Sequence, residues 1–263
     1  MSNKGVRAGG RVLVKSLPSQ GKPTRLSPEE SRHLLTVLRK QEGEVLEALD
    51  GKGGAVECVL RLQGHDAILE WKSQSSGQSS ASVATLSRIV LGQAILKGEA
   101  MEWVVEKSVE LGADGLLPLV CDHCVVKLDK KGPEAFRERW GRIADQALKQ
   151  CGRRQALEVM EPKDLIPALR ALQSKLNARV LFFDEAERSG APALLDHLLA
   201  MGTPLRPLVL LIGPEGGWSE RERRQLNEFG AEVVSLGSDR ILRAETAALH
   251  ALSIATAVRS RMA

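Results

Sequence analysis

The sequence predicts a small β-barrel domain followed by a larger α/β domain with a largely parallel sheet. Six of the ten residues from 73 to 82 are serine, and such a stretch, with nothing to anchor a core, is typical of a flexible linker. Short alternating strands predominate before it, and strands alternate with helices after it. We therefore expect domains at residues 1–72 and 83–263, joined by this linker.

The first domain contains several short strand patterns and one helix, which in about 70 residues favours a small β-barrel. Ser27 is the predicted N-cap of the helix, Pro28 its first residue, and Glu30 the partner that completes a capping box. The strands are expected in an extended run from Val12 and at residues 44–49, 55–62 and 67–71, with a turn at 50–54. The expected apolar stripe of the helix is Leu34, Leu35, Val37 and Leu38.

The second domain alternates apolar runs with amphipathic segments, which is the pattern of an α/β fold. Ser219, followed by Glu222, marks one helix start, and Gly230 marks its end. The expected strands are residues 86–91, 115–120, 157–160, 180–183, 208–212 and 233–236. The other helices are expected at about 101–111, 134–150 and 245–261.

Composition excludes several classes of protein. The chain has 263 residues, and 37 Lys and Arg against 33 Asp and Glu give a net charge of +4, too little for a polybasic protein. With no tyrosine and four phenylalanines, we do not expect an RNA-binding sheet that stacks bases on rows of aromatic side chains. No apolar run has membrane-spanning length, and residues 1–11 lack the apolar stretch of a signal peptide. We expect a soluble, cytoplasmic protein.

The four cysteines are Cys58, Cys121, Cys124 and Cys151. Cys121 and Cys124 have the spacing of half a zinc site, but the spacing of the remaining Cys and His residues does not demand a second pair of ligands. We expect ordinary reduced thiols and no metal.

Charge is uneven along the first domain. Residues 1–40 contain nine Lys and Arg and two acids, whereas residues 41–72 contain three and seven. The basic half could attract a polyanion. A solvated surface that happens to be basic explains the same count equally well.

One segment with features of a ligand site is the apolar strand 208–212 and the glycine-rich turn Gly213-Pro214-Glu215-Gly216-Gly217, which leads into a capped helix. Glycines at the carboxyl end of a parallel strand let the backbone approach a ligand closely. The spacing fits neither a P-loop nor the dinucleotide-binding fingerprint. A tight turn without a ligand is the simpler alternative. The run of five turn-type residues at 213–217 makes that alternative the less favoured one.

A second such segment runs from Leu236 to Ala247, again between a strand and a helix. Glu245 falls in the first turn of the helix, where the macrodipole stabilises a carboxylate. Arg243 lies at the loop edge, where a surface ion pair would be its simplest role.

Together these two segments resemble the RsmE family of 16S ribosomal RNA uridine N3-methyltransferases, in the SPOUT superfamily. The motifs that carry the resemblance are Ile212-Gly-Pro-Glu-Gly-Gly217 and Ile241-Leu-Arg-Ala-Glu-Thr-Ala247, with Leu236-Gly237 ahead of the second. Further similarity at 93–112, 125–128 and 150–153, and in the first domain at 33–39 and 50–53, extends it over most of the chain. Lys149 departs from the glutamate usual in the family before Gln-Cys-Gly-Arg.

The resemblance implies a PUA-like first domain that helps to hold RNA, and a second domain threaded into a trefoil knot. It further implies an obligate homodimer and S-adenosylmethionine bound in the knot against three loops. The cofactor-binding residues implied are Phe183, Asp184, Gly213, Pro214, Glu215, Gly216, Gly217, Leu236, Gly237, Ile241, Leu242 and Arg243.

For the methylation itself, N3 of uridine must lose its proton, and the resulting anion must be stabilised. Arg243 is the candidate for stabilising the anion, and Glu215 and Glu245 are the candidates for taking the proton. The candidate RNA-binding residues are Arg25, Arg32, Arg39, Lys107, Lys127 and Arg153, and the partner is 16S rRNA or the small ribosomal subunit. The alternatives are a SPOUT methyltransferase that acts on another RNA and a non-enzymatic RNA-binding protein.

Overall fold

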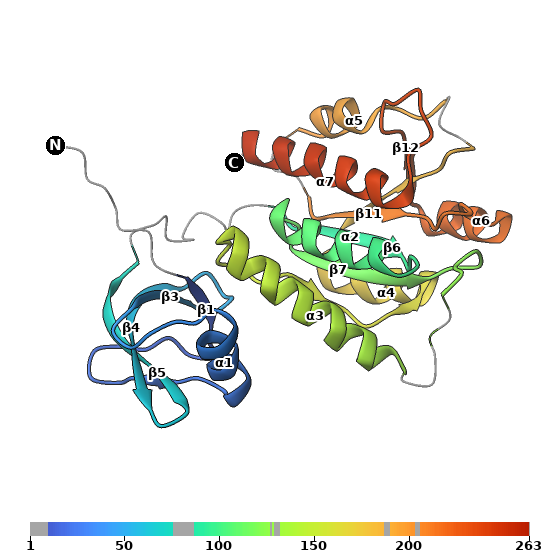
Figure 1. The fold of residues 1–263 in the computed structure, drawn as a ribbon. Helices are drawn as coiled ribbons and strands as arrows, with labels where there is room; N and C mark the ends of the chain where they lie inside the picture. The colour runs from blue at the N-terminus through green and yellow to red at the C-terminus, as the bar shows by residue number, and fades with distance from the viewer. Residues whose placement is uncertain are drawn as a thin grey trace. The chain divides into compact units, whose positions relative to one another are not determined.

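The structure, a computed structural model, describes residues 10–75, 87–126, 128, 132–186, 190–202 and 206–262 (Figure 1). The chain divides into two compact units. Unit 1 comprises residues 1–84 together with 148–156, and unit 2 comprises residues 85–147 and 157–263. Most of the predicted linker lies outside the described residues. Its first two residues, Ser73 and Gln74, belong to the last strand of unit 1.

Unit 1 is a half-barrel of five strands around its own apolar core. The strand order is β1 (Arg11–Leu13), β3 (Val45–Leu49), β4 (Ala55–Gln63), β5 (Asp66–Gln74) and β2 (Thr24–Arg25). Alternate residues of each strand face the core, as the period of a strand requires, so Leu46, Cys58 and Leu69 are fully buried. The predicted strands and the turn at 50–54 are confirmed, and Asp50 closes that turn by accepting the N–H groups of Lys52 and Gly54.

The predicted helix begins as expected and then changes its winding. In α1 (Pro28–Arg32), the Ser27 hydroxyl accepts the N–H of Glu30 at 3.2 Å. The chain continues as a π-helix over His33–Val37, which holds more residues per turn and shifts the apolar positions out of phase. The predicted stripe is therefore wrong in part: Leu34 is buried, but Val37 and Leu38 are 65% and 44% exposed.

Residues 148–156 belong to unit 1, although the sequence places them between helix and strand of the second domain. Arg11 donates to the carbonyl oxygens of Lys149 and Gln150 at the end of α3 (Gly132–Cys151), where a cation stabilises the helix dipole. Gly152 has φ +77°, and a Cβ there would lie 2.6 Å from the Arg11 guanidinium. The glycine of the Gln-Cys-Gly-Arg segment is thus explained by the approach of Arg11.

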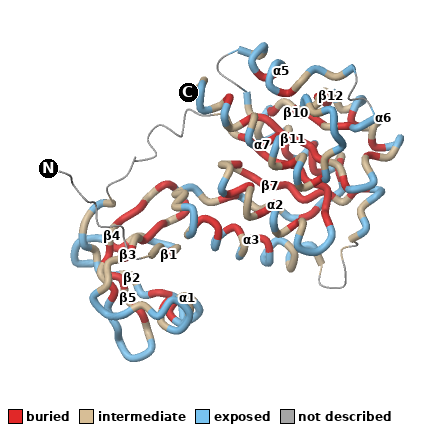
Figure 2. Tube along the Cα trace, turned by 45° about the horizontal axis from the view of Figure 1, so that its top comes forward, coloured by how far each residue is buried: buried red, intermediate tan, exposed pale blue. Residues whose placement is uncertain are grey.

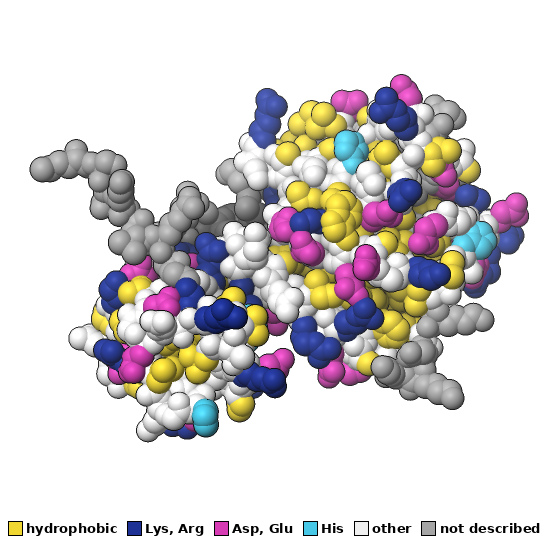
Figure 3. Space-filling view, in the orientation of Figure 1, with side chains coloured by type: hydrophobic (Ala, Val, Ile, Leu, Met, Phe, Trp, Pro, Cys, Tyr) yellow, Lys and Arg dark blue, Asp and Glu magenta, His cyan; other side chains and the backbone are white. Residues whose placement is uncertain are grey.

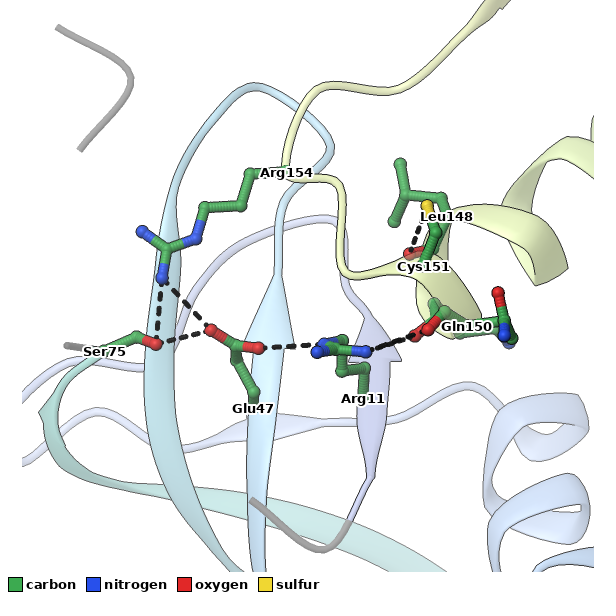
Figure 4. A network of polar contacts seen from close by, with 8 residues as sticks. Arg11, Glu47, Ser75, Leu148, Gln150, Cys151 and Arg154 are labelled. Carbon is green, nitrogen blue, oxygen red and sulfur yellow. Dashed lines mark hydrogen bonds and ion pairs between the residues drawn. The ribbon is translucent and has the colours of Figure 1, made fainter. Parts of the chain in front are cut away.

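Glu47 of β3 links β1, the end of β5 and the 148–156 segment within unit 1 (Figure 4). Its carboxylate accepts from Arg11 Nε at 3.1 Å, from Arg154 Nη2 at 3.2 Å and from the Ser75 hydroxyl. Burial by itself would raise the pKa of Glu47, but the hydrogen bonds from Ser75 and Arg11 and the charge of Arg154 outweigh it and lower the pKa. Lys149 likewise finds a partner in Glu30 at 2.7 Å, so Glu30 is paired with Lys149 rather than completing the predicted capping box.

We expect Glu47→Gln to lower the free energy of unfolding of unit 1 by about 1–2 kcal/mol at pH 7, as loss of charged hydrogen bonds does. Because the folded pKa is lowered, this contribution is complete above the ordinary glutamate value of 4.5 and is lost as the pH falls through the folded pKa. Hydrogen exchange of β3 and β4 at pH 7 and pH 3.5 measures both effects. Glu70→Gln, which breaks an exposed pair with Arg61, is the matched control. An equal loss in both variants would contradict the prediction.

In the described part of unit 2 the sheet contains seven strands, and all of their pairings are parallel. This confirms the predicted α/β class. The order is β12 (Glu232–Val234), β10 (Arg179–Phe183), β11 (Leu208–Ile212), β6 (Ile89–Ala94), β7 (Gly115–Val120) and β8 (Glu158–Val159), with β9 (Lys163–Asp164) also paired to β7. β11 lies on one side of β10, and the next strand in the chain, β12, lies on the other. Parallel sheets bind ligands at the carboxyl ends of the strands where the strand order reverses in this way.

Helices cover both faces of this sheet (Figures 1 and 2). On one face α7 (Ala244–Arg261) packs on β6 and β11 and contacts α2 (Glu99–Glu110) and α5 (Leu194–Ala200). The apolar core of the other face includes side chains of α4 (Leu165–Leu176) and of α6 (Glu220–Phe229). Every residue of β11 is buried, as a central parallel strand requires. None of the helices in the described part of the chain is both long and apolar enough to cross a membrane.

The sequence missed β9, α4 and α5 as separate elements. β9 has two residues, too few for an alternating pattern. α4 contains Pro167 in its first turn, which is compatible with a helix but reduces the helical signal. The capping box of α6 is confirmed in both directions, and Gly230 ends that helix with φ +83°.

Candidate active site

A cavity of about 600 Å³ lies at the carboxyl ends of β10, β11 and β12. Three loops line it: the end of β10 with residues 183–185, the glycine-rich turn after β11, and residues 235–243 before α7. The cavity contains ten of the twelve predicted cofactor residues, namely Phe183, Asp184, Gly213, Pro214, Glu215, Gly217, Leu236, Ile241, Leu242 and Arg243. Gly216 and Gly237 lie outside its lining.

The turn after β11 is shaped by Trp218, which the sequence analysis did not single out. The indole is 2% exposed and donates Nε1–H to the carbonyl oxygen of Phe183 at 2.9 Å, so it ties the first two loops together. A Cβ on Gly213 would lie 3.2 Å from this ring. A side chain on Gly213 would therefore crowd the indole. Gly217 has φ +69° and no protein atom within 4 Å of a Cβ placed on it.

Asp184 is positioned by an ion pair within the protein. Its side chain is 1% exposed and binds Arg223 of α6, and its Oδ1 also accepts the N–H of Ala186 at 3.0 Å. This pairing satisfies the buried carboxylate and fixes the loop after β10. Gly237 has φ +66°, so the turn of the backbone explains this glycine.

Arg243, Glu215 and Glu245 all line the cavity, as a reacting group must. Arg243 is the N-cap residue of α7, and its side chain makes no capping hydrogen bond. Among the described residues, none of these three side chains has a hydrogen-bond or ion-pair partner. The surface ion pair considered for Arg243 is therefore absent from the described part of the structure.

His123 and Asp122 are neighbours of the site and lie between Cys121 and Cys124 in the sequence. His123 Nδ1 lies 3.0 Å from the carbonyl oxygens of both Gly216 and Gly217. Asp122 binds Ser219 Oγ at 2.5 Å and the Arg221 guanidinium. Only the tertiary structure brings the loop after β7 to the turn after β11. Within the described residues, no three His, Cys, Asp or Glu side chains gather as a metal site.

The cysteines flanking this loop differ in acidity. All four cysteines of the chain are free. Burial raises the pKa of Cys58 to about 11, and the hydrogen bond with Cys124 together with burial raises that of Cys121. Cys124 has its pKa lowered to about 7, because the Cys121 thiol and the backbone N–H groups of Cys121 and Ile95 stabilise its thiolate against burial.

We expect Cys124 to be alkylated by iodoacetamide with a pH midpoint near 7, since the thiolate is the reacting form. Peptide mass spectrometry over pH 5.5–9.5 would follow each cysteine separately. Cys124→Ser should remove that labelling phase. A midpoint near the ordinary value of 9.0 would contradict the assignment.

Two of the six predicted RNA-binding residues are already paired with acidic side chains. Arg25 binds Asp66 and Gln63, and Lys107 binds Glu106 and Glu110. Arg32 and Arg39 have no ion-pair partner among the described residues, and Arg153 lies in the 148–156 segment of unit 1. Lys127 is outside the described residues. On the face that Figure 3 shows, Lys and Arg are interspersed with Asp and Glu.

A family model described as an RNA methyltransferase domain matches residues 84–256, and a model of an RNA methyltransferase PUA domain matches residues 26–69. The chain belongs to the RNA methyltransferase family. This confirms the resemblance noted in the sequence. The fold of unit 1 is accordingly that of an RNA methyltransferase PUA domain, and unit 2 contains most of the methyltransferase domain.

Named relatives agree with this family. The chain is 30% identical over 230 residues to ribosomal RNA small subunit methyltransferase E of Synechocystis, covering 87% of this chain and 71% of the relative. It is 29% identical to the protein of that name from Bacillus subtilis, covering 87% of each.

Solved structures of methyltransferases resemble the whole chain. A methyltransferase of Legionella pneumophila, in complex with S-adenosylmethionine, is similar with a TM-score of 0.82 and 33% identity, covering 96% of this chain and 98% of that one. Ribosomal RNA small subunit methyltransferase E of Neisseria gonorrhoeae, bound to the same compound, gives 0.79 and 31%, covering 93% and 95%.

Proposed function

We propose that this RNA methyltransferase transfers a methyl group from S-adenosylmethionine to N3 of a uridine in 16S ribosomal RNA. The observation that carries the proposal is the cavity at the ends of β10, β11 and β12, which both family motifs line. Relatives named ribosomal RNA small subunit methyltransferase E and neighbours bound to S-adenosylmethionine support the substrate and the cofactor.

The residues of the cavity fit this cofactor. Its volume of about 600 Å³ is in the range of small-molecule sites. Apolar side chains of Ile212, Leu236 and Leu242 suit the faces of an adenine ring, and the carboxylates of Glu215 and Glu245 suit a ligand that carries positive charge. When bound, S-adenosylmethionine supplies an electrophilic methyl group on a sulfonium. The trefoil knot and the individual cofactor contacts stay predictions.

The protein's own part in the reaction is to place and deprotonate the base. N3 of uridine is a poor nucleophile while it is protonated, and it lies on the pairing edge, so the base must be unpaired. Arg243 stabilises the negative charge that spreads to the base oxygens when the proton leaves. Glu215 or Glu245, each without a partner among the described residues, takes the proton.

RNA affinity comes from several separate contacts to phosphate groups rather than from one continuous positively charged surface. The candidates are Arg25, Arg32, Arg39, Lys107, Lys127 and Arg153. Arg32 and Arg39 are the exposed ones without an ion-pair partner in the described part of unit 1. Arg25 and Lys107 would exchange an acidic partner for phosphate, which reduces their net contribution.

The protein acts as a homodimer in the cytoplasm. Exposed apolar side chains on helices that pack against α7 support the dimer, since such side chains favour burial against a partner. These are Trp103 of α2 and Leu195 and Leu199 of α5.

Two measurements test the function. Calorimetric titration with S-adenosylmethionine separates an enzyme from an RNA-binding protein, and absence of binding would exclude the proposal. Mass-spectrometric mapping of 16S RNA with and without the protein identifies the methylated atom.

Free 16S RNA, assembled small subunits and transfer RNA are compared as substrates in the same assay. Methylation of transfer RNA alone would favour a methyltransferase with another RNA target.

A further inference from the structure

Residues 121–124, here called the β7 loop, contact the turn after β11 although about 93 residues separate them. The two strands are not neighbours, because β6 lies between them. The loop therefore reaches across the end of β6 to touch the glycine-rich turn. His123 contacts the turn itself, and Asp122 contacts Ser219, the N-cap residue of α6 that follows the turn.

The His123 contact has a definite chemical form. Gly216 O and Gly217 O both lie 3.0 Å from Nδ1. Carbonyl oxygens only accept, so Nδ1 must carry the hydrogen and donate it to both. A Cβ on Gly216 would lie 3.0 Å from His123 Cβ, tighter than nearly all real contacts. The missing side chain of Gly216 thus gives room to the histidine, which explains a glycine that does not line the cavity.

Asp122 ties the β7 loop to the start of α6. Asp122 accepts from Ser219 and Arg221, and its own N–H donates to Glu222 Oε1 at 2.9 Å. Glu222 is 2% exposed and also accepts the N–H of Ser219 at 2.9 Å, so the loop is bonded to the first turn of α6. These bonds fix the position from which the imidazole reaches the turn.

We propose that His123 is a positioning residue that holds the Gly216–Gly217 turn in the shape that binds the cofactor; the inference rests on the proposed function. Gly217 lines the cavity, whereas Gly216 and His123 do not, so the imidazole acts through the turn and not on the ligand. Two consecutive glycines leave a turn many alternative conformations. Holding one of them before the ligand arrives reduces the entropy lost on binding.

The test compares three substitutions at one position in the full-length protein. His123→Ala removes the donor, His123→Asn keeps an N–H donor at the same distance from Cβ as Nδ1, and His123→Gln moves it one bond farther. His65→Ala, at an exposed hairpin in unit 1, is the matched control. Calorimetry measures the Kd for S-adenosylmethionine, and single-turnover methylation at saturating cofactor measures the reaction step.

We expect His123→Ala and His123→Gln to raise the Kd about tenfold, which is the size of one lost hydrogen-bonding group. His123→Asn should bind within about twofold of the wild type, and so should the control. At saturating cofactor the single-turnover rate should return to near the wild-type value in every variant, because His123 does not line the cavity.

Three results would overturn the proposal: an unchanged Kd in folded His123→Ala, a His123→Asn variant as weak as alanine, or a rate that stays low at saturation. If the alanine variant does not fold, the contrast between Asn and Gln answers the same question. A wild-type protein that binds no S-adenosylmethionine would instead contradict the proposed function.

Discussion

Replacement of Arg243 by alanine is expected to lower the single-turnover rate of methylation on the order of 10²-fold or more, as loss of one anion-stabilising donor does in other enzymes. Arg243 lines the cavity, and its side chain has no partner among the described residues. In the mechanism we propose, its contribution arises in the transition state, when the uridine base becomes negatively charged. Affinity for S-adenosylmethionine should change little, and Arg243→Lys should rescue only in part, because an ammonium lacks the planar two-donor fork.

Stability provides a second readout for Arg243. The residue occupies the N-cap position of α7, at the positive end of the helix dipole, where a cation is unfavourable by about 0.3–1 kcal/mol. Removing it should leave the free energy of unfolding unchanged or slightly raised while the rate collapses. Arg224→Ala, on the exposed side of α6 and outside the cavity, is the control. A wild-type rate in folded Arg243→Ala would remove Arg243 from the mechanism and leave Glu215 and Glu245 to be tested.

Gly217→Val is expected to abolish detectable binding of S-adenosylmethionine in calorimetry while the protein remains folded. A β-branched side chain at φ +69° costs on the order of 1–3 kcal/mol of backbone strain, which the turn would relieve by changing shape. No protein atom lies within 4 Å of the added Cβ, so the fold itself does not clash with it. The new side chain would instead occupy the wall of the cavity.

A valine substitution at a second glycine is the control that distinguishes backbone strain from damage to the cavity. Gly230 ends α6 with φ +83°, has no atom within 4 Å of a Cβ and lies outside the cofactor cavity. Gly230→Val should therefore cost similar stability and keep cofactor affinity. If folded Gly217→Val binds S-adenosylmethionine like the wild type, the turn after β11 is not part of the cofactor site.

Local patterns predicted the elements around the cavity well, because each is dictated by neighbours in sequence. The run at 208–212 is apolar throughout and forms β11, buried on both faces. Ser219 and Glu222 form the predicted capping box, and the turn at 213–217 opens onto the cavity. The predicted apolar stripe after Arg32 was wrong in part because it assumed the period of an α-helix. The π-helix there holds more residues per turn, and Val37 and Leu38 are exposed.

Charge counted along the chain gave a less reliable prediction. Arg11 and Arg25 belong to the basic stretch, yet they bind Glu47 and Asp66 of the acidic one. A β-sheet places residues that are far apart in sequence on neighbouring strands, so these opposite charges meet although they are counted in different stretches. The polyanion surface expected from residues 1–40 is reduced accordingly.

By itself the sequence determined the α/β class, most of the half-barrel strands, the family and the loops that line the cavity, because periodicity, caps, glycine turns and the family's motifs are written in consecutive residues. Only the tertiary structure decided that residues 148–156 belong to unit 1 and that His123 holds the Gly216–Gly217 turn. They depend on contacts between residues 138 and 93 positions apart, respectively. Such contacts are set by how the elements pack in three dimensions, which leaves no periodic trace in the chain.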